Sequence, residues 1–363
     1  MARAAEMQKA VFGGAQASEL ERSGGADPLR IPRPYLLFLG DETNPGYAKS
    51  AFGIRDWAAE DCVGEYSYGD STLTLGLPEM TPQVAAQHGA KALVIGIANS
   101  GGVILEAWRP HLIAAMDAGL HIVSGMHARL GDVPELAEAA RANNVRLIDI
   151  RRPPANIPIA SGRKRSGKRL LTVGTDCALG KKYTALAMAR GFEARGIDVD
   201  FRATGQTGIL IAGGGIPIDA VVSDFEAGAA EMLSPDAADG HWDIIEGQGS
   251  LLHPGFAAVS VGLLFGSQPD AFVVCHDPSR TEVLGYPGTP LPDIAEIIEA
   301  TILLGKRTNP AIRCGGISLN TKSYDAQEAQ ALIEETARRY GLPAADPIRG
   351  GPHFEALLDS CLA

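Results

Sequence analysis

Continuous apolar runs alternate with stretches of helical periodicity from Tyr35 onward. The run YLLFLGD ends in glycine and aspartate, as strands that are buried on both faces of a parallel sheet often do. The first set of predicted elements comprises strands at 35–41, 92–99, 121–126 and 145–150, with helices at about 103–118 and after Pro134. Strands separated by helices of this length predict a parallel, helix-covered sheet. We therefore expect residues 31–150 to form a small Rossmann-like domain.

A second and longer alternation begins at Leu170. The predicted strands are 170–174, 199–204, 242–250, 271–277 and 312–320, and the predicted helices are about 181–195, 218–233, 292–304 and 325–339. A glycine-rich segment, GQTGILIAGGGIP, follows the second strand and is assigned neither a helix nor a strand. The predicted fold class is therefore α/β with two domains, of which the second, at 170–363, is the larger.

Two segments lie outside these alternations. Residues 151–169, RRPPANIPIASGRKRSGKR, are rich in proline, glycine and basic residues, a composition that indicates a linker. Its basic cluster has two interpretations: it is solvated, or it faces a phosphate. Residues 1–30 lack the continuous apolar region of a secretory signal, so we expect a flexible N-terminal extension.

Charge and cysteine usage narrow the class of protein. The net charge is −11, with no clustered basic run, which disfavours nucleic acid and anionic membranes as partners. No apolar run reaches the roughly 18 residues that a membrane span needs. The five cysteines are scattered, without CxxC pairs, which is typical of a reducing cytoplasm. We expect a cytoplasmic protein that acts on a small molecule, and apolar sheet-edge loops favour a homo-oligomer.

A strand, a glycine loop and a helix follow one another in LLTVGTDCALGKKYTALAMARGF. N–H groups of such a loop and of the helix start converge on one point and, with the helix dipole, bind an anion. Lys181 is expected to reach phosphate oxygens as a point charge. The predicted phosphate-binding residues are Gly174, Thr175, Asp176, Cys177, Ala178, Leu179, Gly180, Lys181, Lys182 and Tyr183. This pattern predicts a P-loop NTPase-like second domain.

Lys182 occupies the position at which Mg-nucleotide loops carry a serine or threonine. That hydroxyl normally binds Mg²⁺, and a lysine cannot replace it. An ammonium in its place suits a diphosphate that is held without metal and not cleaved, such as that of coenzyme A. The His residues also lack the spacing of a metal set such as HExxH, so no metal is expected.

Acidic and basic side chains gather at the predicted carboxyl edge of the second sheet, where ligands of parallel sheets bind. Glu246 ends the strand in IIEGQGS and is the candidate general base, with His253 as the second candidate. Backbone N–H groups near 247–250 are expected to hold an oxyanion. The predicted substrate-binding residues, chosen as polar or close-approach positions at strand ends and in a small nest before a helix, are Arg202, Thr204, Gln206, Thr207, Gly247, Gln248, His276, Arg280, Asn99 and Ser100.

Cys177 lies inside the phosphate loop and has two interpretations. Near helix-start N–H groups and lysines, its thiol is expected to have a lowered pKa and to carry an acyl group in a ping-pong reaction. The alternative is that a small side chain simply fits a tight loop.

Several long motifs together resemble the D-glutamate N-acetyltransferase family (DgcN type), whose second domain is similar to dethiobiotin synthetase. They are GTDC followed by GK, ATGQTGI, VVSDF followed by AGAAE, EGQGSL, GSQPDA and VVCHDPSR, and the resemblance covers about 33–350. It implies a Rossmann-like domain, a P-loop domain and transfer of acetyl from acetyl-CoA to the amine of D-glutamate. It does not assign a catalytic residue.

The residues alone leave two other functional classes open. In a Mg-ATP-dependent ligase or kinase of the dethiobiotin synthetase kind, Asp176 and Glu246 would hold the metal. In a nucleotide-sensing switch or assembly ATPase, the glycine-rich segment GILIAGGGIP would be the mobile element.

Overall fold

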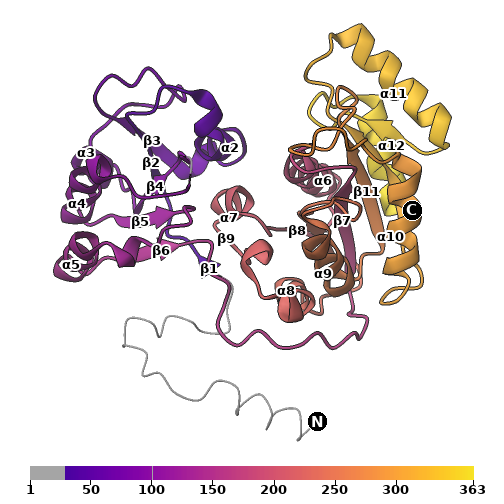
Figure 1. The fold of residues 1–363 in the computed structure, drawn as a ribbon, viewed down its shortest axis with the longest axis horizontal. Helices are drawn as coiled ribbons and strands as arrows, with labels where there is room; N and C mark the ends of the chain where they lie inside the picture. Colours follow the sequence, from indigo (N-terminus) through magenta and orange to yellow (C-terminus); the bar gives the residue numbers. More distant parts are fainter. Residues whose placement is uncertain (1–28, 100) are drawn as a thin grey trace, which may run out of the picture.

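The computed structural model describes residues 29–99 and 101–363. Within them the chain forms two parallel sheets that lie side by side, each flanked by helices (Figure 1). The α/β class and the parallel sheets confirm the sequence prediction. None of the helices in the described part of the chain has the length and apolarity to cross a bilayer.

The first sheet has the strand order β3-β2-β4-β5-β6, with all neighbours parallel. Its strands are β2 (Tyr35–Gly40), β3 (Cys62–Ser67), β4 (Ala92–Ile95), β5 (His121–Ser124) and β6 (Leu147–Asp149). Its helices are α2 (Lys49–Trp57), α3 (Pro82–Gln87), α4 (Arg109–Asp117) and α5 (Pro134–Ala142). Every residue of β2 is buried, as its continuous apolar sequence predicts. The helix expected at about 103–118 is shorter, because a 3₁₀ turn at Glu106–Trp108 precedes α4.

The second sheet is parallel throughout, with the order β13-β12-β11-β7-β10-β8. Its strands are β7 (Lys168–Gly174), β8 (Val199–Arg202), β10 (Trp242–Ile245), β11 (Ala271–His276), β12 (Arg313–Leu319) and β13 (Ala344–Ala345). Its helices are α6 (Lys181–Ala194), α7 (Gln206–Ala212), α8 (Glu226–Leu233), α9 (Ala257–Ser267), α10 (Ile294–Gly305), α11 (Ala326–Tyr340) and α12 (Pro352–Leu362). Strand β7, which leads into the phosphate loop, lies between β11 and β10.

The glycine-rich segment after β8 is not a loop throughout, because it contains α7. This helix ends at Gly213, whose φ of 74° places it in the left-handed region that glycine adopts without strain. The next two residues form β9 (Gly214–Gly215), which pairs antiparallel with β1 (Leu29–Arg30). The start of the first domain is therefore joined by a short sheet to the second domain.

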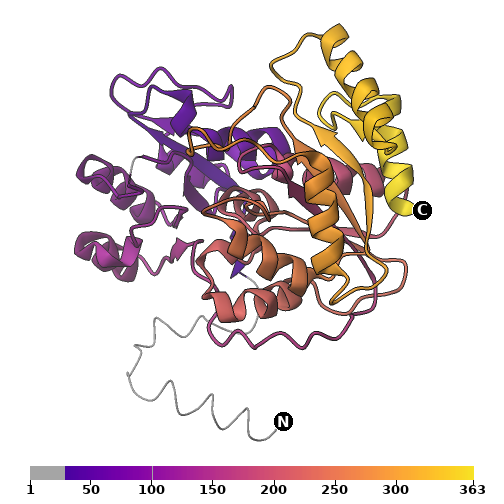
Figure 2. The same ribbon diagram turned by 45° about the vertical axis from the view of Figure 1, so that its right-hand side comes forward.

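Helices α2 and α7 bring the two domains into contact (Figures 1 and 2). The hydroxyl groups of Ser50 and Thr207 lie 3.2 Å apart at this contact. Nearby, the Trp57 ring stacks on Tyr183 at a centroid distance of 5.9 Å, and Arg190 donates a 2.7 Å hydrogen bond to the Trp57 carbonyl. Residues from α2, α6 and α7 thus fix the carboxyl edge of the second sheet against the first domain.

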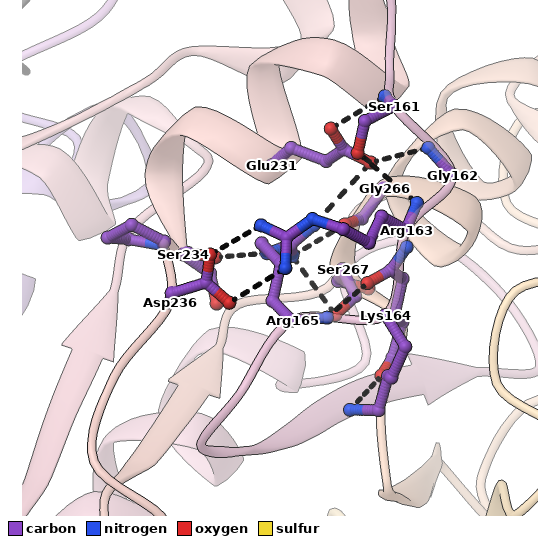
Figure 3. A network of polar contacts seen from close by, with 12 residues as sticks. Ser161, Gly162, Arg163, Lys164, Arg165, Glu231, Ser234, Asp236, Gly266 and Ser267 are labelled. Carbon is purple, nitrogen blue, oxygen red and sulfur yellow. Dashed lines mark hydrogen bonds and ion pairs between the residues drawn. The ribbon is translucent and has the colours of Figure 1, made fainter.

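Two arginines of the basic segment at 151–169 are not solvated, although Arg152, Arg163 and Lys168 of the same segment are exposed. Arg165 and Arg169 are buried, and Figure 3 shows the network around Arg165. Arg165 donates to the carbonyls of Ser234 at 2.6 Å and Gly266 at 2.8 Å. Arg169 donates to the Ser234 hydroxyl at 2.6 Å. Protein acceptors therefore use these guanidinium groups, which attach the segment to α8 and α9.

Candidate active site

The phosphate loop runs from the end of β7 at Gly174 to the start of α6 at Lys181. Ala178 has a φ of 53° and Gly180 a φ of 111°, so the chain turns twice through the left-handed region. Gly180 is the N-cap of α6, and no side chain caps this 14-residue helix. Its first N–H groups therefore remain available to an anionic ligand, which the helix dipole also attracts.

Asp176 and Arg280 hold the phosphate loop in shape. Asp176 is buried and accepts hydrogen bonds from the Cys177 N–H at 2.6 Å, the Leu284 N–H at 2.9 Å and Arg280 at 3.1 Å. Arg280 also donates to the carbonyls of Cys177 at 2.8 Å and Ala178 at 2.9 Å. Arg280 therefore braces the loop, and these contacts favour a structural role over its predicted role in substrate binding.

Lys181 and Lys182 point to different partners. The buried Lys181 ammonium donates a 2.7 Å hydrogen bond to the Asp176 carbonyl, and burial lowers its pKa. Lys182 is half-buried, with its ammonium 4.6 Å from the centroid of the Tyr183 ring. Burial lowers the pKa of Lys182, while Glu246 is the carboxylate that most opposes this change. Lys182 thus acts electrostatically on the candidate base.

Glu246 follows β10 directly, and only 4% of its surface is exposed. Its Oε2 accepts hydrogen bonds from the N–H groups of Thr204 at 2.9 Å and Gly205 at 3.0 Å. Within the described residues, no hydrogen bond uses Oε1. Burial raises the pKa of Glu246, and the charge of Lys182 and the two N–H donors offset part of this rise. A fixed carboxylate with one unused oxygen and a raised pKa has the properties of a general base.

Glycines create the space for this carboxylate. A Cβ atom on Gly208, in the first turns of α7, would overlap Glu246 Oε2 and lie 2.8 Å from its Cδ. A Cβ atom on Gly205 would lie 2.6 Å from the Gln248 amide nitrogen and 3.4 Å from Glu246 Oε1. The segment ATGQTG therefore lets α7 begin directly against Glu246. Sequence reasoning noted these glycines but not their function, which only the paired strand ends show.

The contacts of His253 favour Glu246 over it as the candidate base. Its Nδ1 accepts hydrogen bonds from the N–H groups of Gly255 at 3.0 Å and Phe256 at 3.2 Å. In a neutral ring the proton then lies on Nε2, which is 3.5 Å from Asp176 Oδ1. Neither nitrogen has a free lone pair for a substrate proton. The Nε2 atom is buried beside the Asp176 carboxylate and makes no hydrogen bond within the described residues.

Arg202 does not face a substrate either. Its guanidinium donates to Asp243 at 2.6 Å and pairs with Asp200 at 2.8 Å, both on neighbouring strand positions of the second sheet. The Thr204 hydroxyl donates to the Glu246 carbonyl at 2.7 Å and accepts from the Gln248 amide at 3.0 Å. These three predicted substrate residues therefore have protein partners, and Thr204 and Gln248 position the strand end that carries Glu246.

The remaining predicted residues fall into two groups. Near the site, the Gly247 N–H donates to Thr172 Oγ1 at 2.9 Å, so it is not free for an oxyanion, and Thr175 Oγ1 is hydrogen bonded to His276 Nδ1 at 3.0 Å. At the domain contact, Gln206 and Thr207 begin α7. In the first domain, Asn99 hydrogen bonds the Val103 N–H and carbonyl, both at 2.9 Å, and the next helical turn in the described residues starts at Glu106. Ser100 lies outside the described residues.

The Cys177 thiol lacks the activation that an acyl carrier needs. Burial raises its pKa, although Lys181 and Arg280 partly oppose this effect. A thiol with a raised pKa carries little thiolate at neutral pH. The interpretation of Cys177 as a small residue in a tight loop is the one that the geometry favours.

Two groups of side chains bring potential metal ligands within 4.8 Å of one another: Asp176, Cys177 and His253, and Asp200, His241 and Asp243. In the first group Arg280 already pairs with Asp176, and in the second Arg202 pairs with both aspartates. The donor sets thus include a guanidinium that neutralises them, and His253 presents a protonated Nε2 to the first. Neither arrangement fits a divalent cation without a change of partners.

Comparison with known proteins identifies both domains. Residues 158–357 match the DUF1611 C-terminal model, described as a P-loop domain of unknown function, and residues 61–153 match the corresponding N-terminal Rossmann-like domain. A crystal structure of a DUF1611 family protein from Anabaena variabilis superposes with a TM-score of 0.80 at 32% identity, covering 91% of this chain and 99% of that one.

Two relatives have curated names. The D-glutamate N-acetyltransferase of a Pseudoalteromonas species is 49% identical over 323 residues, which is 89% of this chain and 97% of the relative. The D-glutamate N-acetyltransferase of Tritonibacter scottomollicae is 49% identical over 321 residues, which is 88% and 96% of the two chains.

Proposed function

The chain belongs to the DUF1611 family, and from this membership and the geometry around Glu246 we infer that it is an enzyme that transfers an acetyl group to the amine of D-glutamate. The two named relatives match it over nearly their whole length, which supports the same reaction. The observation that carries the chemistry is the buried Glu246 carboxylate, with one fixed oxygen, one unused oxygen and a raised pKa.

We propose acetyl-CoA as the acetyl donor. It supplies an activated thioester and carries a diphosphate that suits the uncapped start of α6. The N–H groups of the loop and the Lys181 ammonium would hold that diphosphate. Lys182 lacks the hydroxyl through which Mg-nucleotide loops bind their metal, and its ammonium acts on Glu246. This arrangement favours a diphosphate held without Mg²⁺.

Glu246 is proposed to take the proton from the amine of D-glutamate. The amine attacks a carbonyl only when it is unprotonated, so a base with a pKa near neutrality assists the reaction. The N–H groups of Thr204 and Gly205 hold Oε2, so the carboxylate cannot rotate freely and the direction of Oε1 is fixed. With the Cys177 pKa raised by burial, direct transfer from donor to amine is favoured over transfer through an acetylated thiol.

We also propose a homo-oligomer in the cytoplasm. The five cysteines of the described residues are free thiols, which suits a reducing compartment. Large apolar side chains are exposed beside the phosphate loop, at Leu252, Phe256, Leu284 and Tyr286. Such a patch is typical of a subunit contact. Light scattering after gel filtration is expected to give more than one copy, and a monomer at micromolar concentration would contradict the assembly.

One assay separates the proposed reaction from an ATP-dependent one. Protein, D-glutamate and acetyl-CoA are mixed in the presence of EDTA, and free CoA thiol is followed. We expect thiol release that depends on D-glutamate and continues in EDTA. Absence of thiol release, together with Mg²⁺-dependent formation of ADP from ATP, would establish the ligase or kinase alternative. Lys181→Ala is expected to abolish binding of acetyl-CoA, and unchanged affinity would show that the loop is not the donor site.

A further inference from the structure

A polar cavity of about 400 Å³ opens between the two domains, at the carboxyl edge of the first sheet. Its volume lies in the range of roughly 300–1,000 Å³ that is typical of small-molecule sites. It is lined by the loop after β5, which includes Met126 and Arg129, by Asp149 and the loop after β6, which carries Arg151 and Arg152, and by Ala220 of the second domain. We call this space the arginine cavity.

Three arginines and one carboxylate, Asp149, line the arginine cavity. Arg151 pairs with Asp219 at 2.8 Å, and Arg152 lies 3.8 Å from Asp149. Within residues 29–99 and 101–363, no carboxylate lies at ion-pair distance from Arg129. Asp149 is further occupied by the Leu130 N–H at 3.1 Å. The arginine cavity is therefore a cationic pocket whose guanidinium groups can take additional carboxylate partners.

Two connections link the arginine cavity to Glu246, one through contacts and one through charge. The Gln206 side chain reaches Gly125, where a Cβ atom would lie 2.7 Å from its Oε1, and Gly125 precedes the cavity residue Met126. Gln206 follows Gly205, whose N–H holds the Glu246 carboxylate. From the other side, the charge of Asp219, the partner of Arg151, acts on Glu246.

We propose that the arginine cavity binds the carboxylate groups of the acidic amino acid whose amine Glu246 deprotonates. This inference rests on the proposed function, and it assigns the preference for a dicarboxylic acceptor to Arg129, Arg151 and Arg152. Lys182, at the start of α6, and Gly205, at the start of α7, both act on Glu246. The donor at the phosphate loop and the acceptor in the arginine cavity thus meet at one carboxylate. The two domains together form the acceptor site, since Ala220 completes its wall.

Arg129→Gln tests this assignment, because Arg129 is exposed and makes no ion pair within the described residues, although its charge also lowers the pKa of Asp149. The matched control is Arg141→Gln, an exposed arginine of the same domain on α5 outside the cavity. Calorimetry of D-glutamate binding needs no turnover, so it reports on the cavity even if the reaction differs from the proposed one. We expect Arg129→Gln to weaken D-glutamate binding by about 10-fold to 100-fold, the usual effect of a lost charged hydrogen bond, and Arg141→Gln to leave it unchanged.

Three readouts separate the outcomes. Loss of D-glutamate affinity with unchanged acetyl-CoA affinity in Arg129→Gln supports the proposal. Unchanged D-glutamate affinity in both Arg129→Gln and Arg152→Gln overturns it. A loss of acetyl-CoA affinity in these variants, with D-glutamate affinity unchanged, also overturns it, since that result would assign the cavity to a phosphate of the donor. Circular dichroism confirms that each variant is folded. A wild-type protein that binds D-glutamate through Arg129 but releases no thiol would overturn the proposed function and retain the cavity as an acidic amino-acid site.

Discussion

Gly208→Ala tests the site by moving Glu246 without removing any functional group. The added Cβ atom would overlap Oε2 of Glu246 and lie 2.8 Å from its Cδ and 3.1 Å from its Oε1, against an ordinary contact of 3.4–4 Å. The carboxylate must therefore shift by roughly 1 Å, and displacements of this size cost about 100-fold in rate. The shift also pulls Oε2 from the N–H groups of Thr204 and Gly205.

The same substitution also changes stability, which is measured separately from the rate. Alanine in place of glycine favours a helix by about 1 kcal/mol, and Gly208 lies within α7. Overpacking a buried site costs about 1–3 kcal/mol, and each hydrogen bond lost from the buried carboxylate costs about 1.5–3 kcal/mol. We therefore expect the Tm of the variant to be lower than that of the wild type.

The assay is release of CoA thiol at saturating acetyl-CoA and D-glutamate, at a temperature well below the Tm of the variant. We expect kcat to fall about 100-fold with unchanged affinity for acetyl-CoA. Gly240→Ala is the matched control: it precedes the strand that carries Glu246, and its Cβ atom would meet nothing within 4 Å. A kcat for Gly208→Ala equal to that of Gly240→Ala would refute the placement of Glu246 at the reacting amine.

Three further predictions concern charges near the loop. Lys182→Thr removes the cation that opposes the raised pKa of Glu246, so the acid limb of kcat/KM should move to higher pH; an unmoved limb would mean that Lys182 does not act on Glu246. Burial raises the Glu246 pKa in the folded state, so the contribution of this group to stability is present at low pH and is lost as the pH rises through the folded-state pKa. The Tm of Glu246→Gln minus that of the wild type should therefore increase between pH 4 and pH 8. A constant difference in Tm would contradict the raised pKa. Cys177→Ser should keep kcat within about threefold, and mass spectrometry of the wild type should find no acetylated Cys177; an acetylated thiol on the reaction path would restore the ping-pong scheme.

Much of the architecture follows from the apolar pattern of the chain. The buried strands β2 and β11 are almost continuous apolar runs, and such runs have few alternatives to the middle of a parallel sheet. The phosphate loop could also be predicted from the sequence, because a strand, a glycine loop and a helix follow one another in that order. Helix α9 lacks the periodicity of a surface helix because its sequence, AAVSVGLLFGS, is apolar almost all round, and sequence analysis therefore missed it.

Helix α7 was missed for a different reason. Its glycine content lowers helix propensity, and the need for Gly208 becomes visible only when Glu246 lies against it. Tertiary contacts therefore determine that this segment is helical, and its intrinsic helix propensity does not.

The site was only partly predictable. The sequence predicts Glu246 at the carboxyl edge of the sheet, because this residue ends a predicted strand and the carboxyl ends of all parallel strands lie at that edge. Position and residue type could not reveal that Arg202 pairs with Asp243, two residues from the end of the neighbouring strand, or that Arg280 braces Asp176. Those pairings depend on side-chain directions in the folded protein. The arginine cavity was likewise hidden, because its walls come from two loops of one domain and a residue of the other.

The pH dependence of kcat/KM for D-glutamate in the wild type and in Glu246→Gln tests the role of Glu246 as general base most directly. We expect an acid limb in the wild type, since a protonated Glu246 cannot accept the proton of the amine. We expect a kcat about 10²-fold to 10⁴-fold lower in Glu246→Gln, the usual contribution of a general base, with the acid limb lost and acetyl-CoA affinity unchanged. A variant that keeps both the wild-type rate and the wild-type pH profile would contradict the central role of Glu246.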